Sequence, residues 1–232
     1  MVSDDGRLVL AIDTSLDDCS AAIAAGGGDR IVAARTERIG RGHAERLPGL
    51  IDGVLAEAGA GFRDIAMVAV TIGPGSFTGV RVGVSAARGY ALALGIPSVG
   101  ISSLHAMAEG VRTTHAVLAV HDAKRGEVYA LLLGADGSIL SPPRALAPES
   151  IGDMLAGIDG PIDLTGSAAE MILGTLPHHE TMISSARSEI DIATVARLAC
   201  GSVGVEAAKP LYLRSADAKP ASRPFSLFAQ KA

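Results

Sequence analysis

Apolar and polar residues follow one another along this chain in blocks that predict strands and helices in a regular order. Apolar stretches at 7–13, 19–25 and 30–37, separated by turn-forming residues, predict an antiparallel meander of three strands. Residues 43–58 carry apolar side chains at helical spacing, which predicts an amphipathic helix. The run 65–73 is continuously apolar and rich in β-branched residues, as expected of a strand buried on both faces.

The first half continues with a predicted helix at 79–94, a strand at 97–101 and a helix from Ser103, which gives the order βββαβαβα. The pattern then restarts, because residues 115–140 again predict three strands joined by turns. The remaining elements are expected as a helix near 148–156, a strand at 162–166 and helices at 167–173 and 190–202. This repetition predicts two α/β lobes of ribonuclease-H-like architecture in tandem, with mixed sheets flanked by helices and a shortened second lobe.

We predict an N-terminal lobe at 1–103, a smaller C-terminal lobe at 104–216 and a loosely ordered tail at 217–232. Each half opens on an apolar strand that ends in an acidic residue, Asp13 in the first and Asp122 in the second. Actin, sugar kinases and Hsp70 share this architecture and hold Mg²⁺ and phosphate near the first such aspartate. That parallel is an analogy of fold alone.

The segment "GPGSFTGVRVG" at 73–83 joins a predicted strand to a predicted helix and resembles three known devices. The segment is not a Walker A loop, because Val80 occupies the position where that motif requires a lysine. It does not match the dinucleotide-binding fingerprint, because Thr78 occupies the position of the last glycine. It does not match a nucleophile elbow either, because Pro74 and Thr78 occupy the two positions around Ser76 where that motif requires glycine.

Two interpretations of this turn stay open from the residues themselves. The glycines permit a tight packing turn, with Thr78, or less readily Ser76, capping the helix through its oxygen. Alternatively, the free N–H groups at the start of the helix form an anion site, with Arg81 in the first turn helping to hold the ligand.

The predicted helix at 79–94 is apolar around nearly its whole circumference, so it must be buried on nearly every side. Gly79, Gly83, Ala87 and Ala91 recur every four residues and form a ridge of small side chains that permits close helix approach. This ridge fits packing within the chain and packing against a partner equally well.

Composition disfavours several classes of function. Aromatic residues make up 3% of the 232, tryptophan is missing and the net charge is −5, which disfavours an autonomous nucleic-acid binder. No apolar stretch fits a signal peptide or a membrane span, and the distant Cys19 and Cys200 fit buried thiols in a reducing compartment. We therefore expect a cytoplasmic protein without membrane contact.

Candidate catalytic sets fail on spacing. His43 has Leu47 four residues on, where a zinc helix needs a second histidine. His121 and Asp122 are neighbours on a predicted strand and point to opposite faces, so no Ser/His/Asp set can be proposed. No catalytic residue and no metal ligand is therefore predicted. The cations in the "DAKRGEVY" turn predict a polar hairpin that could also meet an acidic partner or a phosphate.

Five segments together resemble one family: "LAIDTS", "HAERLPGLI", "GPGSFTGVRVG", "DAKRGEVY" and "PLYLR". They resemble, in order and across nearly the whole chain, the TsaB (YeaZ) proteins of bacterial tRNA threonylcarbamoyladenosine synthesis. The resemblance implies an accessory subunit, a shortened paralogue of the catalytic subunit TsaD, that pairs with TsaD and with it recruits the small ATPase TsaE. The complex modifies adenosine 37 of tRNA, which the accessory subunit contacts only indirectly.

The resemblance also implies which residues form the pairing surface and which contact a nucleotide. Pairing of the paralogues uses the two helices of the first lobe, and isolated family members form homodimers through the same face. The partner interface is predicted at Leu47, Leu50, Ile51, Val54, Val80, Gly83, Val84, Ala87 and Ala91. A vestigial nucleotide or phosphate contact is predicted at Asp13, Gly75, Ser76, Thr78 and Arg81, with ATP or ADP at the TsaD interface and no intrinsic cofactor.

Two competing functions are kept. The first is an autonomous ATPase or kinase-like protein of the same fold that uses Asp13 and the glycine turn. The second is a metallopeptidase, as the name glycoprotease used for the wider family suggests, although the sequence offers no peptidase site.

Overall fold

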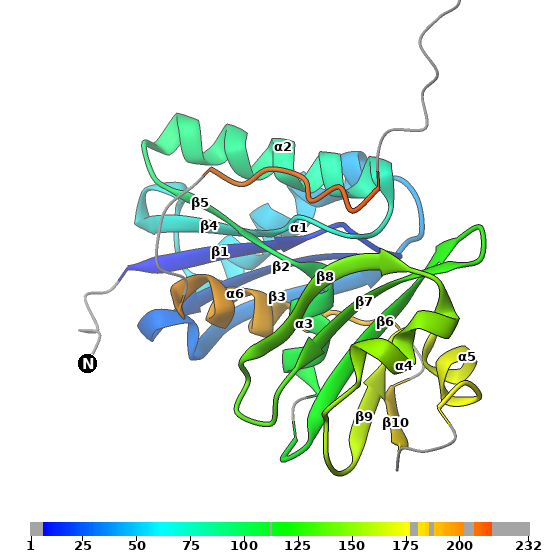
Figure 1. Cartoon of the computed structure of the whole chain (residues 1–232). Coiled ribbons are helices and arrows are strands. Elements are labelled where there is room, and N and C mark those ends of the chain that lie inside the picture. The colour runs from blue at the N-terminus through cyan, green and yellow to red at the C-terminus, as the bar shows by residue number, and fades with distance from the viewer. Residues whose placement is uncertain (1–6, 112, 177–180, 186–187, 202–206, 215–232) are drawn as a thin grey trace, which may run out of the picture.

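The computed structural model describes residues 7–111, 113–176, 181–185, 188–201 and 207–214, and it contains two five-stranded sheets (Figure 1). In the first sheet the strands run in the order β3-β2-β1-β4-β5, and in the second in the order β10-β9-β6-β7-β8. The strands of the first sheet are β1 (Leu8–Asp13), β2 (Asp18–Ala25), β3 (Arg30–Arg38), β4 (Ile65–Thr71) and β5 (Ser98–Ile101). Those of the second are β6 (Ala116–Lys124), β7 (Glu127–Leu133), β8 (Ile139–Leu146), β9 (Ile162–Thr165) and β10 (Thr181–Ser185).

Both sheets are mixed in the same way. The central strand β1 pairs antiparallel with β2 and parallel with β4, and β6 pairs antiparallel with β7 and parallel with β9. The predicted meander at the start of each half is therefore present. The prediction of two ribonuclease-H-like α/β lobes in tandem is confirmed by this repeated topology.

Side-chain alternation along β1 divides the first lobe into two cores. Leu10 and Ile12 pack on one face beneath α1 (His43–Ala58) and α2 (Phe77–Leu94). Val9 and Ala11 pack on the opposite face against α6 (Ile192–Gly201). The helix predicted at 43–58 has these bounds in the structure, whereas α2 begins two residues earlier than predicted.

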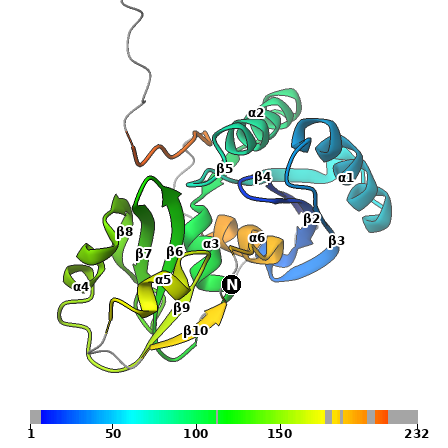
Figure 2. The ribbon, with the colours of Figure 1, turned by 90° about the vertical axis from the view of Figure 1, so that its right-hand side faces the viewer.

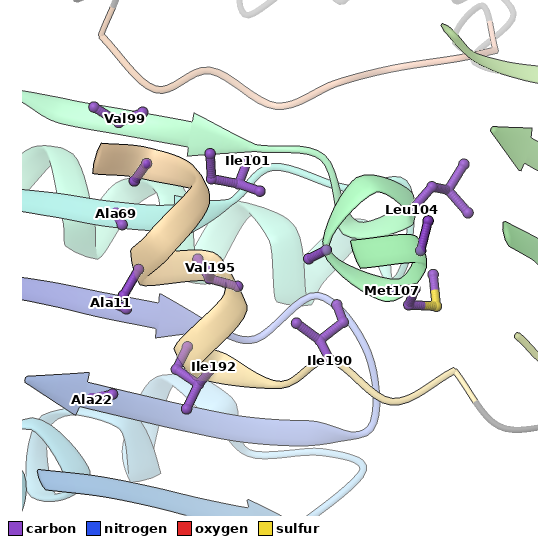
Figure 3. Close-up of a cluster of buried hydrophobic side chains, with 14 of the residues drawn as sticks. Ala11, Ala22, Ala69, Val99, Ile101, Leu104, Met107, Ile190, Ile192 and Val195 are labelled. Atoms are coloured by element: carbon purple, nitrogen blue, oxygen red, sulfur yellow. The ribbon is translucent and has the colours of Figure 1, made fainter. Parts of the chain in front are cut away.

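The last helix of each half packs across the boundary between the halves. Figure 2 shows α6 and α3 (Ser103–Gly110) between the two sheets, with α1 and α2 on the far side of the first sheet. Helix α3 packs on β6 and β7, while α6 packs on β1 and β2. Leu104 and Met107 of α3 belong to the same apolar cluster as Ile190 and the α6 side chains (Figure 3), so one cluster joins both lobes. The predicted division at 103/104 stays a prediction, and α6 belongs by packing to the first sheet.

The second lobe is shortened in its helices and not in its sheet. Helices α4 (Ile151–Met154) and α5 (Ala169–Leu173) have 4 and 5 residues, against 16 and 18 in α1 and α2. The helix predicted near 148–156 is thus mostly a short 3₁₀ turn followed by α4. Strand β10 was not predicted, because the edge-strand sequence "TMISS" lacks apolar alternation.

None of the helices in the described ranges is long and apolar enough to cross a membrane. The predicted loosely ordered tail at 217–232 lies outside the described residues.

Candidate functional site

The glycine turn between β4 and α2 packs its backbone directly on the turn that follows β1. A Cβ atom at Gly75 would lie 2.2 Å from the carbonyl oxygen of Ser15, and one at Gly79 would lie 2.1 Å from that of Thr14. The Thr14 hydroxyl donates to the Gly79 carbonyl oxygen at 2.7 Å. The Ser76 N–H donates to the Ser15 carbonyl oxygen at 2.8 Å. These glycines are required for contact between two backbones, which is the packing interpretation of the motif.

Helix α2 begins at Phe77 and is capped by Ser76. The Ser76 hydroxyl oxygen accepts a hydrogen bond from the Gly79 N–H at 3.2 Å, as an N-cap side chain does. The prediction that Thr78 is the preferred cap is wrong, because Thr78 already lies within the first turn. Thr78 is exposed and lines the cavities beside the helix start instead.

Asp13, at the end of β1, is sealed from solvent and has a hydrogen-bonding role. Its side chain is 1% exposed, and its Oδ1 accepts from the Ser15 N–H at 3.0 Å, the Ser15 hydroxyl at 2.7 Å and the Thr71 hydroxyl. Burial raises the pKa of this carboxyl, and the hydrogen bonds from Thr71 and Ser15 partly oppose that rise. The predicted nucleotide contact by Asp13 would require this carboxyl to become accessible, and it stays a prediction.

Arg81 is engaged in a contact with the C-terminal segment 207–214. Its guanidinium carbon lies 3.6 Å from the centre of the Phe77 ring, and its Nε donates to the Tyr212 hydroxyl at 2.8 Å. The Leu211 N–H donates to the Ile72 carbonyl oxygen at 2.8 Å, so the segment is tied to the end of β4. The "PLYLR" motif thus covers the start of α2, and Arg81 is committed to that contact.

All nine residues predicted as the partner interface are buried within the chain. Gly83 faces β1 and β4, since a Cβ atom there would lie 2.5 Å from the Thr14 Oγ1 and 3.3 Å from Val70 Cγ2. The small-residue ridge therefore serves packing of α2 on its own sheet. Within the described chain these residues are buried in α1 and α2, and their assignment to a partner interface stays a prediction: Leu47, Leu50, Ile51, Val54, Val80, Gly83, Val84, Ala87 and Ala91.

The outer face of the same two helices carries a groove of about 550 Å³. Its lining combines apolar and polar side chains: Ala44, Leu47, Pro48, Phe77, Thr78, Arg81, Val82, Ser85, Ala86 and Tyr90. Phe77 at one end is 59% exposed, and Leu92 near the other end of α2 is 85% exposed. Large apolar side chains left exposed along a groove are a feature of protein contact surfaces. Of these residues the sequence placed only Leu47 at the partner interface, and it placed Thr78 and Arg81 at a phosphate contact, because α2 is apolar on nearly every side and its outer face could not be identified.

The cleft between the lobes brings together residues that spacing could not connect. His121 Nδ1 lies 2.6 Å from the Ser188 hydroxyl and 3.1 Å from the Ser167 hydroxyl, beside a cavity of about 630 Å³. Burial lowers the pKa of His121, which favours the neutral ring. Asp122 lines the same cavity, and its carboxylate pairs with Lys124 Nζ at 2.7 Å. The prediction that His121 and Asp122 form no catalytic set stays a prediction.

The "DAKRGEVY" motif forms the β6–β7 hairpin, and Arg214 holds it. Lys124 and Arg125 both have positive φ angles, 63° and 59°, in the left-handed region that non-glycine residues seldom adopt. Arg214 donates to the Ala123 carbonyl oxygen at 2.9 Å, to that of Lys124 at 3.0 Å and to the Glu127 carboxylate. The segment that covers α2 therefore also fixes the shape of this hairpin.

Metal-ligating side chains do not gather in the described part of the chain, where no three His, Cys, Asp or Glu residues form a cluster. His43 begins α1 and is 7% exposed, and Leu47 lies one turn further on. The prediction that the chain holds no metal is otherwise untested.

Comparisons with known proteins give one consistent result. The family model for TsaD, described as tRNA N6-adenosine threonylcarbamoyltransferase, matches residues 33–148. The chain is 33% identical over 221 residues to the Escherichia coli tRNA threonylcarbamoyladenosine biosynthesis protein TsaB, covering 89% of this chain and 94% of that protein. It is 40% identical to the Haemophilus influenzae protein of the same name over about half of each, 52% of this chain and 51% of that one.

A solved structure agrees with the sequence matches. The Pseudomonas aeruginosa protein described as YeaZ superposes with a TM-score of 0.73 and 27% identity, covering 89% of this chain and 100% of that one. A second Pseudomonas aeruginosa structure, described as an uncharacterized protein with similarity to peptidase YeaZ, gives a TM-score of 0.74 and 28% identity, covering 90% of this chain and 100% of that one.

Proposed function

Because the chain belongs to the TsaB (YeaZ) family, we propose that it is a non-catalytic subunit in tRNA threonylcarbamoyladenosine biosynthesis and pairs with a TsaD homologue. In this proposal it acts as scaffold and activator, and a TsaE homologue joins the pair. The single observation that carries the proposal is the match to Escherichia coli TsaB, which extends over 94% of that protein.

The groove between α1 and α2 supports pairing at this face. The buried ridge of small residues holds α2 close to its own sheet, and the groove lies on the opposite face of α1 and α2, where only the start of α2 is covered by the 207–214 segment in the described chain. Phe77 is exposed in the groove, Leu92 is exposed further along α2 beside a second cavity, and the side chains of Ala86 and Val82 leave room for another helix. A helix pair of the TsaD homologue that packs on this groove would bury these apolar side chains.

The glycine turn and Asp13 support a role without catalysis. Gly75 and Gly79 approach the chain's own backbone at the place where a phosphate cradle would leave open N–H groups. Asp13 is 1% exposed and cannot reach a ligand in this conformation. The alternative of an autonomous ATPase needs both features to be open.

An arginine in the groove is expected to abolish pairing. Ser85 is exposed and lines the groove, so Ser85→Arg adds a long cation to an apolar contact without touching the core. We expect at least about 100-fold weaker binding to the TsaD homologue, measured by calorimetry, and loss of co-purification. Gly83→Arg and Ala87→Arg are unsuitable, because both positions are buried and the variants would misfold.

Met171→Arg is the matched control for this experiment. Met171 is 51% exposed on α5 of the second lobe, so the variant adds the same charge to an exposed helix far from the groove in sequence. It should bind like the wild type. Equal binding by Ser85→Arg and wild type would show that the paralogue docks elsewhere.

The purified chain alone is expected to hydrolyse ATP no faster than the background rate, because no catalytic residue has been placed in an open site. The measurement is phosphate release with and without the TsaD and TsaE homologues. Turnover by the isolated chain that disappears in Asp13→Asn would favour the autonomous ATPase instead.

A further inference from the structure

Residues 207–214, which we call the strap (orange in Figure 1), contact both lobes. The Ala208 N–H donates to the Ser98 hydroxyl oxygen at 3.2 Å, and the Ala208 side chain is buried in the core of the first lobe. The Leu211 N–H donates to the Ile72 carbonyl oxygen at 2.8 Å. The strap is therefore fixed to the first sheet before it reaches the hairpin between β6 and β7.

Two side chains of the strap join the start of α2 to this hairpin. The Tyr212 hydroxyl oxygen accepts from the Arg81 Nε at 2.8 Å, and the Tyr212 ring lies 6.0 Å from the Phe77 ring. Arg214 donates to two backbone carbonyl oxygens of the hairpin at 2.9 and 3.0 Å and to the Glu127 carboxylate. Two residues of extended chain span at most about 7 Å, so a displacement of one contact is passed to the other.

Lys124 of the hairpin is held in a conformation that its own sequence does not favour. The two-residue loop of Arg125 and Gly126 requires positive φ angles, and theirs are 59° and 77°. Lys124 lies before that loop, where the β6–β7 register shifts, and its φ of 63° is disfavoured for a residue with a side chain. The Asp122 carboxylate accepts from the Lys124 N–H at 2.7 Å, and Arg214 binds the Lys124 carbonyl oxygen. Loss of the Arg214 contact removes one of these two restraints and lets the hairpin relax.

The two ends of the strap adjoin different hollows of the surface. Lys124 lines the cavity of about 630 Å³ between the lobes, so the conformation of the hairpin sets part of that cavity's wall. Phe77 and Arg81 line the groove between α1 and α2. One short segment therefore touches the walls of both.

We propose that the strap couples the groove to the cavity between the lobes. While Arg81 and Phe77 hold Tyr212, Arg214 reaches the hairpin and Lys124 stays left-handed. When the contact at Arg81 is lost, Arg214 leaves its acceptors and the hairpin relaxes. A ligand that distinguishes these two states at one hollow must change the affinity of the other hollow by a reciprocal factor. The coupling is a property of this chain alone and does not depend on docking of a TsaD homologue.

Amide hydrogen exchange of the isolated full-length chain, followed by NMR, tests the coupling. Arg214→Met removes the hairpin contact and should speed exchange over residues 121–129 about 10-fold or more. Arg81→Met removes only the contact at the start of α2 and should still speed exchange over the same residues about 3-fold or more. Arg63→Met removes an equal charge at the opposite end of β4, where Arg63 is exposed, and should leave the hairpin unchanged.

The Arg81→Met result decides the matter even if Arg214→Met does not fold, because Arg81 is exposed and acts on the hairpin only through the strap. Wild-type exchange of the hairpin in Arg81→Met would overturn the proposal. Exchange in β2, where residues 19–25 are buried in the first sheet, shows whether the effect is local. Equal acceleration of β2 and the hairpin would mean a general loss of stability and would also refute the coupling.

Lys124→Gly tests whether the strained residue carries the effect. Glycine adopts positive φ without a steric penalty, so the hairpin should keep its shape when the strap is disturbed. In the Lys124→Gly background, Arg81→Met should therefore change hairpin exchange by less than about 2-fold. An undiminished response to Arg81→Met in that background would show that the strain is not the link and would contradict the proposal.

Discussion

Replacing Gly79 with alanine is expected to destabilise the fold by at least about 2 kcal/mol. The new Cβ would lie 2.1 Å from the Thr14 carbonyl oxygen, which belongs to the backbone at the end of β1 and has no rotamer with which to yield. Helix α2 would have to move away from β1, and the hydrogen bond from the Thr14 hydroxyl to the Gly79 carbonyl oxygen would lengthen. The free energy of unfolding, measured by urea titration, gives the effect.

Gly89 in the same helix provides the control. It is exposed, and a Cβ atom there would meet no atom within 4 Å. Alanine has a higher helix propensity than glycine, so Gly89→Ala should stabilise the fold by up to about 1 kcal/mol. The two substitutions are therefore expected to have opposite signs. A stabilised Gly79→Ala variant would mean that the turn is loose, and the packing interpretation would fail.

The order of strands and helices was largely readable from the sequence because most elements bury one clear face. Residues 43–58 show a single apolar face, and the predicted bounds match α1. The edge strand β10 carries no such signal, so it was not predicted. The exchange of α3 and α6 between the lobes could not be foreseen, because it depends on packing between halves far apart in sequence.

The candidate site was less predictable than the fold. The pattern identified the ridge from Gly79 to Ala91 but could not say which side of α2 meets the sheet, because small residues permit close packing with either neighbour. The contact of Arg81 with Tyr212 joins residues 131 positions apart. Likewise, the buried Nε2 of His43 has no hydrogen-bond partner among the described residues, and the spacing of histidines in the sequence could not predict this.

Asp13 combines full burial with a cluster of hydroxyl donors. Its Oδ1 accepts from the hydroxyls of Ser15 and Thr71, and the Ser103 hydroxyl donates in turn to the Ser15 oxygen at 2.9 Å. Desolvation is the largest cause of the raised pKa of this carboxyl. The folded state therefore favours the protonated form relative to the unfolded chain, where the pKa is near its ordinary 3.8.

The sign of the resulting pH dependence follows from proton linkage. A carboxyl with a raised folded-state pKa contributes its full stability below the unfolded pKa and loses it as the pH rises through the folded pKa. Asp13→Asn keeps an oxygen acceptor and removes the titration. The unfolding free energy of the variant minus that of wild type should therefore increase with pH above 3.8, at up to about 1.4 kcal/mol per pH unit, until the folded pKa is passed.

Urea unfolding of wild type and Asp13→Asn at a series of pH values from about 4.5 to 8 measures this difference. Asp52→Asn makes the same chemical change at an exposed position on α1 and controls for the loss of one negative charge. A stability difference for Asp13→Asn that stays constant with pH would mean that burial does not hold this carboxyl protonated. The aspartate would then be an ionised group in a site more open than the fold implies, and the case for a chain without a nucleotide site of its own would weaken with it.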